Sequence, residues 1–385
     1  MKSLNNELKT FKESIFATIS HKAVEANAVN LGQGFPNFDG PKWLKDLCAK
    51  AFDSDIANIN QYAPSPGRIE LREAIASNMR DFYGLSYDAN SEVTVFNGAT
   101  EALFCAAFAL LNPEDEVIVF EPFYDSYLAN IKLTKATTKV VTLHAPNFRF
   151  KLDELERAFS KNTKMMYLNS PHNPSGTVFN REELEQIAAL CKKWDVYVVS
   201  DEVYEHLTFG EIEHIPIASL EGMRERTITI SSAGKTFGYT GWKIGWAIAP
   251  KELTHALRMI HQFNTFSVCH PIQIAMAEGL NRLSEYLPEF KELYSKKKDL
   301  LIKGLKDAGF DPISPEGTYF VLCPIPDNGM DDIAYCLHLI EKHKVATIPP
   351  SSFYLNSDDG KKYIRFCFAK TDEVLNEAIS NLKKK

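Results

Sequence analysis

Two lysines stand eight residues apart in the segment SSAGKTFGYTGWKIGW, residues 231–246, which follows a β-branched run. Lys235 lies among Ser, Ala and Gly at the expected end of a strand, and Lys243 comes later in the same segment. Two chemistries use a lysine in such a place. One is the phosphate-binding loop of nucleotide-binding proteins, and the other is a lysine that forms an imine with an aldehyde cofactor such as pyridoxal phosphate.

The spacing excludes a nucleotide-binding loop. That motif requires a glycine five residues before the Gly-Lys pair, and Thr229 stands there. The dinucleotide-binding motif GxGxxG is absent as well, because GQG at 32–34 is followed by Asn37 where the third glycine belongs. The imine chemistry remains, and it demands partners for the cofactor's phosphate, ring nitrogen, phenolic oxygen and ring face.

The elements that must position such partners are visible in the hydrophobic pattern. Strand-like runs alternate with helical patterns, and they cover residues 92–97, 116–121, 139–143, 164–169, 196–201, 227–232 and 243–249. Such alternation predicts an α/β domain around a largely parallel sheet, in which ligands gather at the carboxyl ends of the strands. After residue 250 a long helical tract precedes a smaller α+β unit. We expect a large domain over residues 41–285 and a small domain made of residues 1–40 and 286–385.

Candidate phosphate ligands follow the first of these strands. The turn Gly98-Ala99-Thr100 joins the strand to a helix, so free backbone N–H groups and the positive helix end face any anion bound there. Ser232 would add a hydroxyl group and Lys243 a charge. A helix cap alone would also explain this turn.

Other strand ends carry residues that suit the cofactor ring. Asp201 would keep the ring nitrogen protonated, because an opposite charge favours the charged form. Asn173 in NSPHNPSG and Tyr204 in SDEVYE would donate hydrogen bonds to the phenolic oxygen, and Tyr124 in EPFYDSY would cover the ring face. Each residue has an ordinary structural explanation. Their joint occurrence at strand ends carries the prediction of a pyridoxal phosphate site.

The strings NPSG, SDEVYE, SSAGKTF, GWKIGW and YIRFCFAK, in this order, resemble the pyridoxal-phosphate aminotransferases of the aspartate-aminotransferase-like fold, also called fold type I. The similarity extends over essentially the whole chain. LGQGFP, NQYAP, NGATEALF and EPFYDSY are more similar to the methionine and kynurenine–glutamine aminotransferase branch. The resemblance implies an α/β fold whose large domain has a mostly parallel seven-stranded sheet.

The resemblance also implies roles for single residues. Lys235 would bind the cofactor covalently and then move the proton between the substrate Cα and the cofactor, with Asp201 and Tyr204 as its catalytic partners. Arg365 would grip the substrate α-carboxylate with its two-pronged guanidinium group. Tyr62 would reach the phosphate of a neighbouring subunit, which makes a homodimer the expected assembly. The remaining implied substrate contacts are Gly34, Asn173, Phe16 and Phe266.

The substrate side departs from one branch of the family. Animal-type kynurenine aminotransferases have an aromatic residue near Thr100 and a histidine near Ser267. Threonine and serine here favour a methionine-type or broad apolar and aromatic pocket. We expect ping-pong transfer of the α-amino group of methionine, kynurenine, glutamine or a Phe/Tyr-type amino acid to a 2-oxo acid. A β-lyase acting on cysteine conjugates or cystathionine, and a non-catalytic cofactor-binding regulator, are the alternatives.

Composition excludes several other classes of protein. With 43 Lys and Arg against 50 Asp and Glu, the net charge of −7 argues against a nucleic-acid-binding protein. The seven cysteines are scattered without a CxxC pair, which gives no support for a metal site. No apolar run reaches the roughly 18 residues of a membrane span, and the first residues lack the apolar core of a signal peptide. We therefore expect a soluble, cytoplasmic protein.

Overall fold

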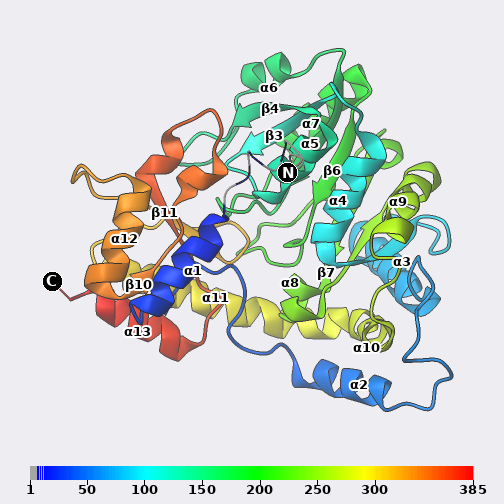
Figure 1. The fold of residues 1–385 in the computed structure, drawn as a ribbon, viewed down its shortest axis with the longest axis horizontal. Coiled ribbons are helices and arrows are strands. Elements are labelled where there is room, and N and C mark those ends of the chain that lie inside the picture. The colour runs from blue at the N-terminus through cyan, green and yellow to red at the C-terminus, as the bar shows by residue number, and fades with distance from the viewer. Residues whose placement is uncertain (1–6, 8, 10, 12, 385) are drawn as a thin grey trace, which may run out of the picture.

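The computed structural model of the protein describes residues 7, 9, 11 and 13–384. Its centre is a seven-stranded sheet in the order β2-β8-β7-β6-β5-β3-β4 (Figure 1). The strands of this sheet are β2 (Val93–Asn97), β3 (Glu116–Glu121), β4 (Thr137–Thr142), β5 (Thr163–Asn169), β6 (Tyr197–Asp201), β7 (Thr227–Ser232) and β8 (Ile244–Ile248). Each overlaps a predicted strand. Among these seven, only β8 runs in the direction opposite to the others, so the predicted α/β fold with a mostly parallel sheet is confirmed.

The sheet is buried on both faces, as a parallel sheet requires. In β3, Val117 and Val119 pack on one side, and Ile118 and Phe120 pack on the other. The first side is covered by α4 (Gly98–Leu110), α5 (Ser126–Thr134) and α9 (Lys251–Asn264). The second side packs on α6 (Leu152–Ala158) and α7 (Arg181–Trp194). This two-sided burial explains why the strands read as nearly continuous apolar runs.

Helix α7 shows how local sequence sets an element's limits. Asn180 caps its first turn by accepting a hydrogen bond from the backbone of Glu183, whose side chain accepts one from the Asn180 backbone in return. Two lysines, Lys192 and Lys193, stand in the last turn, where cations suit the negative helix end. These local interactions account for where the helix begins and ends.

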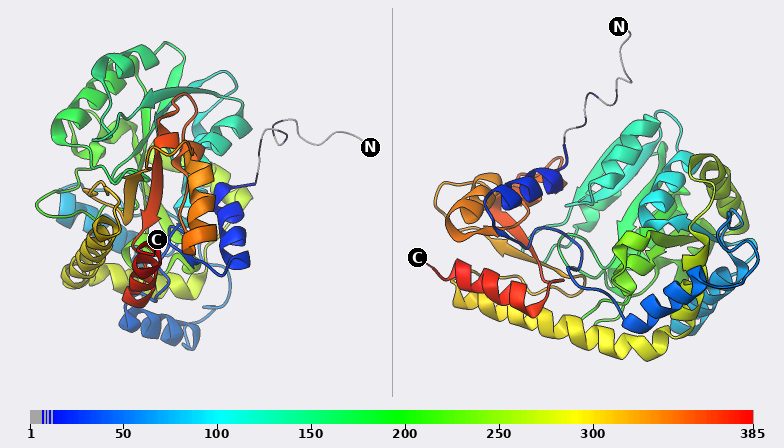
Figure 2. Two further views of the ribbon diagram at one scale, coloured as in Figure 1. Left: turned by 90° about the vertical axis from the view of Figure 1, so that its left-hand side faces the viewer. Right: turned by 60° about the horizontal axis from the view of Figure 1, so that its bottom comes forward.

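A second group of elements joins the two ends of the chain. Two small sheets pair β1 (Val29–Asn30) with β10 (Val345–Ala346), and β9 (Phe320–Pro324) with β11 (Tyr363–Cys367). The helices beside them are α1 (Ile15–Glu25), α12 (Asp332–His343) and α13 (Asp372–Leu382). In Figure 2 this group lies to one side of the large sheet. The division at residues 40 and 285 remains a prediction.

Apart from the short helix α8 (Ala233–Thr236), four further α-helices belong to the described chain. They are α2 (Lys42–Phe52), α3 (Ile69–Tyr83), α10 (His270–Asn281) and α11 (Leu283–Asp307). Helix α10 packs on both α2 and α3, and α11 extends from α10 to α13 along the lower edge of the right-hand view in Figure 2. In the described part of the chain, every helix is too short or too polar to cross a membrane.

Candidate active site

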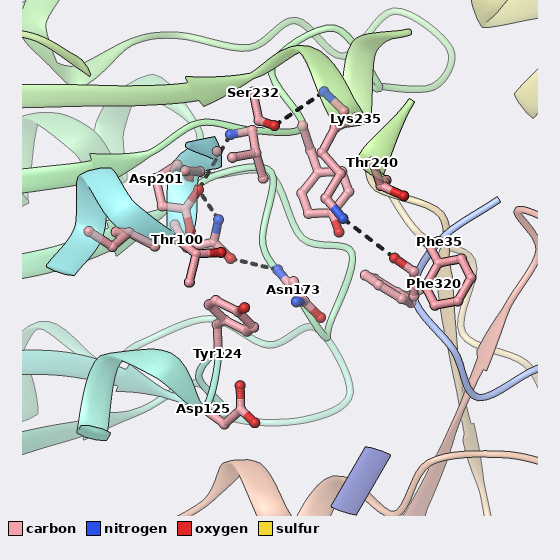
Figure 3. A pocket seen from close by; sticks show the side chains of 18 of the residues that line it. Phe35, Thr100, Tyr124, Asp125, Asn173, Asp201, Ser232, Lys235, Thr240 and Phe320 are labelled. Carbon is pink, nitrogen blue, oxygen red and sulfur yellow. Dashed lines mark hydrogen bonds between the residues drawn. The ribbon is translucent and has the colours of Figure 1, made fainter. Parts of the chain in front are cut away.

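Several strands of the large sheet end around one cavity of about 330 Å³. Asn169, Asp201 and Ser232 are the last residues of β5, β6 and β7, and α4 begins at Gly98 directly after β2. The cavity brings together most of the predicted site residues: Phe16, Gly34, Gly98, Ala99, Thr100, Tyr124, Asn173, Asp201, Tyr204, Ser232, Lys235, Lys243 and Arg365. Figure 3 shows Asp201, Thr100 and Tyr124 on one side and Lys235 reaching toward the segment that carries Phe35.

Lys235 lies in the short helix α8 (Ala233–Thr236) that follows β7. Its Nζ atom lies 2.9 Å from the hydroxyl oxygen of Tyr319 and 3.4 Å from the carbonyl oxygen of Gly34. Burial lowers the pKa of its amino group to about 8, against an ordinary value of 10.5, because the charged form loses its hydration. At pH 7 roughly a tenth of this amine is therefore uncharged, far more than at the ordinary pKa, and the uncharged form is the one that acts as a nucleophile or base.

Asp201 is a buried carboxylate at the end of β6, with 4% of its surface exposed. Its Oδ2 atom accepts a hydrogen bond of 2.7 Å from the hydroxyl group of Tyr127. Burial raises its pKa to about 6, and this hydrogen bond opposes the rise. A cation bound beside Asp201 would stabilise the carboxylate form. The site thus suits a ligand with a protonated ring nitrogen.

The start of α4 forms an anion-binding turn. Gly98 has a φ of +77°, and a Cβ atom there would lie 3.1 Å from the Nζ atom of Lys243. In the part of the chain that the structure describes, no side chain caps this helix start, so the amides of its first turn are open to a ligand. Gly245 packs so closely that a Cβ atom on it would lie 2.5 Å from the amide nitrogen of Ala99. Glycine at both positions keeps the backbone amides close to the cationic side chain, as a phosphate requires.

Arg365 lies on β11 and is 1% exposed. Its Nη1 atom donates to Oδ1 of Asn173 at 3.0 Å, and its Nη2 atom donates to the carbonyl oxygen of Gly32 at 3.0 Å. The Nε atom is buried and has no hydrogen-bond partner among the described residues. Three phenylalanine rings surround the guanidinium group, those of Phe16, Phe320 and Phe353. Burial lowers the pKa of Arg365 to about 10, so the group is still a cation at neutral pH.

Asn173 and Tyr204 line the same cavity as Asp201, Lys235 and Arg365. The backbone N–H of Asn173 donates to Oδ1 of Asn169 at 2.8 Å, which fixes the loop after β5. Tyr204 is buried, and its ring meets that of Tyr319 edge to face at 5.2 Å between centroids. Burial raises the pKa of the Tyr204 hydroxyl, which therefore keeps its proton and can donate it in a hydrogen bond. Tyr124 faces the cavity from the opposite side (Figure 3).

Two predicted residues lie outside the cavity of their own chain. Tyr62 is 82% exposed, and its ring meets that of Phe266 edge to face at 5.3 Å. Phe266 is 46% exposed and adopts a φ of +67°. For Tyr62 this position agrees with the expectation that it acts in a neighbouring subunit. Phe266 does not contact the cavity within this chain, and its role as a substrate contact stays a prediction.

Sequence reasoning missed several residues of the site. Tyr127 follows Tyr124 by three residues within the quoted string EPFYDSY, and this second tyrosine near a strand end is the signal that could have revealed it. Asn169 ends a predicted strand. Tyr319 and Phe320 come from TYFVLCP, a strand-like run with no chemical pattern. Only the three-dimensional contact with Lys235 gives Tyr319 a place in the site.

Comparisons with known proteins agree with this geometry. Residues 26–382 match the family model described as aminotransferase class I and II. Kynurenine–oxoglutarate transaminase of Dictyostelium discoideum is 39% identical over 99% of this chain and 96% of its own. The crystal structure of YbdL from Escherichia coli, described as having a methionine aminotransferase function, superposes with a TM-score of 0.95 at 38% identity and covers 100% of both chains. N-succinyldiaminopimelate aminotransferase from Mycobacterium tuberculosis also has a TM-score of 0.95, at 39% identity over 99% of both chains.

The fold and the cavity define a transaminase. The chain belongs to the aminotransferase class I and II family, as the sequence motifs predict. The relatives named above are all transaminases, and they give no support to the lyase or the non-catalytic alternative. Within the described residues, no group of three or more His, Cys, Asp or Glu side chains is arranged to hold a metal ion.

Proposed function

We propose that this transaminase uses pyridoxal 5′-phosphate to move the α-amino group of a sulphur-containing or aromatic amino acid to a 2-oxo acid. One observation carries the proposal. A lysine amine whose pKa is lowered to about 8 shares a cavity with an anion-binding helix start, a buried aspartate and a buried arginine. These groups match the aldehyde, phosphate and ring nitrogen of the cofactor and the carboxylate of the substrate.

The residues fit this cofactor in number and chemistry. Thr100, Ser232 and Lys243 would join the amides of Gly98 and Ala99 around the phosphate. Asp201 would pair with the protonated ring nitrogen, and this cation would offset the burial that raises the aspartate's pKa. Asn173 and Tyr204 would hold the phenolic oxygen, and Tyr124 would cover the ring. The glycine at position 98 supports this fit, because a side chain there would crowd the amine of Lys243.

Pyridoxal phosphate supplies an aldehyde that condenses with amino groups and a cationic ring that accepts electron density from the substrate Cα. Lys235 has two tasks in this scheme. It would hold the resting cofactor covalently. Once the substrate has displaced it, its amine would take the proton from the substrate Cα and pass that proton to the cofactor. Its lowered pKa suits both tasks, since a fully protonated amine could do neither.

Arg365 would bind the α-carboxylate of the substrate. Its cationic group is buried, and its described polar contacts are an amide oxygen and a carbonyl oxygen, with Nε left without a partner. A carboxylate would give this group the ionic partner that its burial calls for. Because Asn173 contacts Arg365 directly, binding of the substrate and of the cofactor would be coupled through that side chain.

The lining of the cavity supports an apolar or aromatic side chain on the substrate. Phe16, Phe35, Leu103 and Phe320 provide apolar surface. Among the described residues that line the cavity, the cations are Lys235, Lys243 and Arg365, and each already has a role above. Asp125 adds a negative charge to the same cavity, which would repel an acidic substrate side chain. The names of the E. coli and Dictyostelium relatives support the same substrate class.

We further propose that the working form is a homodimer in which Tyr62 reaches the phosphate of the partner. Tyr62 is 82% exposed and Phe263 is 87% exposed, and both are large side chains that a partner would cover. Sedimentation of the purified protein tests this assembly. A monomer with full activity would contradict it.

The test of the function is a half-reaction followed by visible absorption. The protein is loaded with pyridoxal phosphate and mixed with L-methionine, L-kynurenine or L-aspartate, without any oxo acid. We expect the band of the lysine-bound cofactor to disappear with methionine or kynurenine, with little change for aspartate at equal concentration. The product expected in stoichiometric amount is the matching 2-oxo acid.

Other results would contradict distinct parts of the proposal. A band that persists while pyruvate forms from cystathionine would favour the β-lyase. A faster reaction with aspartate than with methionine would contradict the substrate class. Failure of the protein to bind pyridoxal phosphate would contradict the proposal as a whole.

A further inference from the structure

Tyr319 is a fully buried residue that contacts the catalytic lysine, although no motif points to it. It lies just before β9, and its hydroxyl oxygen is 2.7 Å from the carbonyl oxygen of Gly34 and 2.9 Å from Nζ of Lys235. The Nζ atom also lies 5.5 Å from the centre of the Tyr319 ring and 5.6 Å from that of Tyr204. The lysine amine is thus enclosed by two rings and two oxygen atoms.

The direction of these hydrogen bonds follows from counting hydrogen atoms. A carbonyl oxygen only accepts, so the single hydroxyl hydrogen of Tyr319 is donated to Gly34. The hydroxyl group of Tyr204, which is also hydrogen-bonded to that of Tyr319, therefore acts as a donor to it. The Tyr319 oxygen then accepts a hydrogen from the amine of Lys235. Burial raises the pKa of Tyr319 well above its ordinary value, so the hydroxyl keeps this hydrogen. The pair Tyr319–Gly34 therefore offers two acceptors to one amine.

Such a pair suits a free amine better than a lysine joined to an aldehyde. A neutral amine has two hydrogen atoms, which the two oxygens can accept, and its lone pair is left free. When that lone pair takes up a proton, the resulting ammonium group has three hydrogen atoms. Two stay with Tyr319 and Gly34, and the third faces away from them and can be given up again. A nitrogen joined to an aldehyde carbon has at most one hydrogen and cannot use both acceptors.

We propose that the Tyr319 hydroxyl and the Gly34 carbonyl form a resting place for the amine of Lys235 after the substrate has displaced it, which makes Tyr319 a positioning residue for proton transfer. The inference rests on the proposed function, since it takes Lys235 as the lysine that binds the cofactor. It assigns Tyr319 no contact with substrate or cofactor.

The segment that supplies the Gly34 carbonyl is itself held firmly. Four successive carbonyl groups, those of residues 32–35, accept hydrogen bonds from side chains. Arg365 binds the carbonyl of Gly32, Tyr319 that of Gly34, and Lys370 those of Gln33 and Phe35 at 3.0 and 2.7 Å. Lys370 is only 4% exposed. The acceptor at Gly34 is thus fixed from both sides, as a resting place for a reactive group requires.

The test compares the full-length, cofactor-loaded wild type with Tyr319→Phe, Lys370→Met and the control Tyr294→Phe. The ring of Tyr319 packs against Tyr204, Phe320 and Tyr294, and phenylalanine keeps these contacts while removing the hydroxyl. Tyr294 is buried beside Tyr319 and lines no part of the cavity, so its variant controls for loss of a buried hydroxyl. Rapid-mixing absorption gives the rate of the half-reaction with L-methionine.

For Tyr319→Phe we expect this rate to fall about 10- to 100-fold, because a poorly held base loses part of its catalytic advantage. The isotope effect with Cα-deuterated methionine should increase, since proton transfer becomes more limiting. Lys370→Met should slow the reaction about 3- to 10-fold by loosening the Gly34 carbonyl. Cofactor affinity and the resting visible spectrum should match the wild type, and Tyr294→Phe should react within about twofold of it.

A second readout does not depend on the reaction. In the full-length protein stripped of cofactor, the pH dependence of acylation of Lys235, followed by mass spectrometry, reports the pKa of its amine. Asp201, Arg365, Lys243 and Cys367 set the charge around this amine and are unchanged in the variant. Loss of an acceptor for its N–H groups should lower the pKa, so that Tyr319→Phe is labelled about 3- to 10-fold faster at pH 7.

The outcomes separate the inference from the function. A wild type that binds pyridoxal phosphate and reacts with methionine, beside a Tyr319→Phe variant with the same rate, isotope effect and labelling, overturns the inference alone. A wild type that does not react with any amino acid overturns the proposed function. If Tyr319→Phe does not fold, an unchanged half-reaction in Lys370→Met counts against the inference, and a slower one with a larger isotope effect supports it.

Discussion

The cavity has two walls that satisfy their charges in different ways. The cofactor wall comes from the ends of the large sheet and includes Asp201 and Lys235, while the substrate wall comes from residues 32–35 and β11 and includes Arg365. On the cofactor wall, Asp201 has a hydrogen-bond donor in Tyr127, and Lys235 has acceptors in Tyr319 and Gly34. Asp201 and Lys235 therefore each have a local hydrogen-bond partner already.

In the described structure, the buried cations on the substrate wall and behind it have no carboxylate as a hydrogen-bond partner. Arg365 and Lys370 are 1% and 4% exposed, and the hydrogen bonds found for them in the described structure go to amide and carbonyl oxygens. Buried cations of this kind are costly unless an anion joins them. Under the proposed function, the groups that bind the cofactor would be positioned before it arrives, whereas the buried arginine of the substrate wall would gain its ionic partner only with the substrate carboxylate.

The largest expected loss of activity comes from a substitution in the cofactor wall. Lys235→Ala should lower turnover at least about 10⁴-fold, because it removes both the covalent attachment of the cofactor and the proton carrier. Formation of the 2-oxo acid from methionine measures this loss. Lys243→Asn is the matched comparison. Asparagine tolerates the positive φ of that position and removes only a phosphate contact, so this variant should bind the cofactor more weakly but still complete the half-reaction.

The next largest loss of activity comes from a substitution in the substrate wall. Arg365→Lys keeps the positive charge but loses the planar fork, and we expect kcat/KM for methionine to fall about 100-fold, mainly through KM. The affinity for pyridoxal phosphate should change little, which distinguishes this wall from the other. Arg282→Lys, at an exposed arginine far from the cavity, is the control. An unchanged KM in Arg365→Lys would show that Arg365 does not bind the substrate carboxylate.

The smallest effect concerns the loop where the two walls meet. His172 precedes Asn173, is 2% exposed, and its Nδ1 atom lies 2.7 Å from the hydroxyl oxygen of Ser175. Burial lowers its pKa to about 3. The unfolded chain, with an ordinary value of about 6.5, binds a proton below that pH which the folded protein does not accept. The free energy of unfolding should therefore decrease as the pH falls from about 6.5 toward 3, by up to about 1.4 kcal/mol per pH unit from this group.

His172→Gln tests that dependence. Denaturant unfolding between pH 4.5 and 7, at one protein concentration, should give a shallower decrease of the free energy of unfolding in the variant than in the wild type. Carboxylates titrate equally in both proteins, so the difference isolates His172. Parallel pH profiles would show that His172 does not resist protonation in the folded protein.

The cofactor wall could be predicted from the sequence because its residues stand at strand ends. Asp201 and Ser232 close β6 and β7, and Gly98 opens the helix after β2, so the alternation of strands and helices was sufficient to bring them together. The family's motifs then supplied Lys235 and Asn173. Periodicity and local motif were enough here, since parallel strands share one carboxyl edge.

Much of the substrate wall, and the residues packed behind the two walls, could not be predicted in this way. Arg365 was found through the resemblance, whereas Tyr319 and Lys370 were not found at all. Gly34 and Tyr319 are separated by 285 positions in the sequence, and the contact exists only because the N-terminal segment packs against the small sheets. Loop positions have no hydrophobic period that marks their partners. The proposed contact of Tyr62 with a neighbouring subunit likewise depends on a second chain, which hydrophobic periodicity within one chain does not describe.

The attachment point of the cofactor is the central claim, and one measurement addresses it directly. The protein loaded with pyridoxal phosphate is reduced with borohydride, digested and analysed by mass spectrometry. We predict that the reduced cofactor is found on the peptide that contains Lys235, at that lysine, and that Lys243 is unmodified. A cofactor fixed to Lys243, or a protein that retains no cofactor after reduction, would contradict the account.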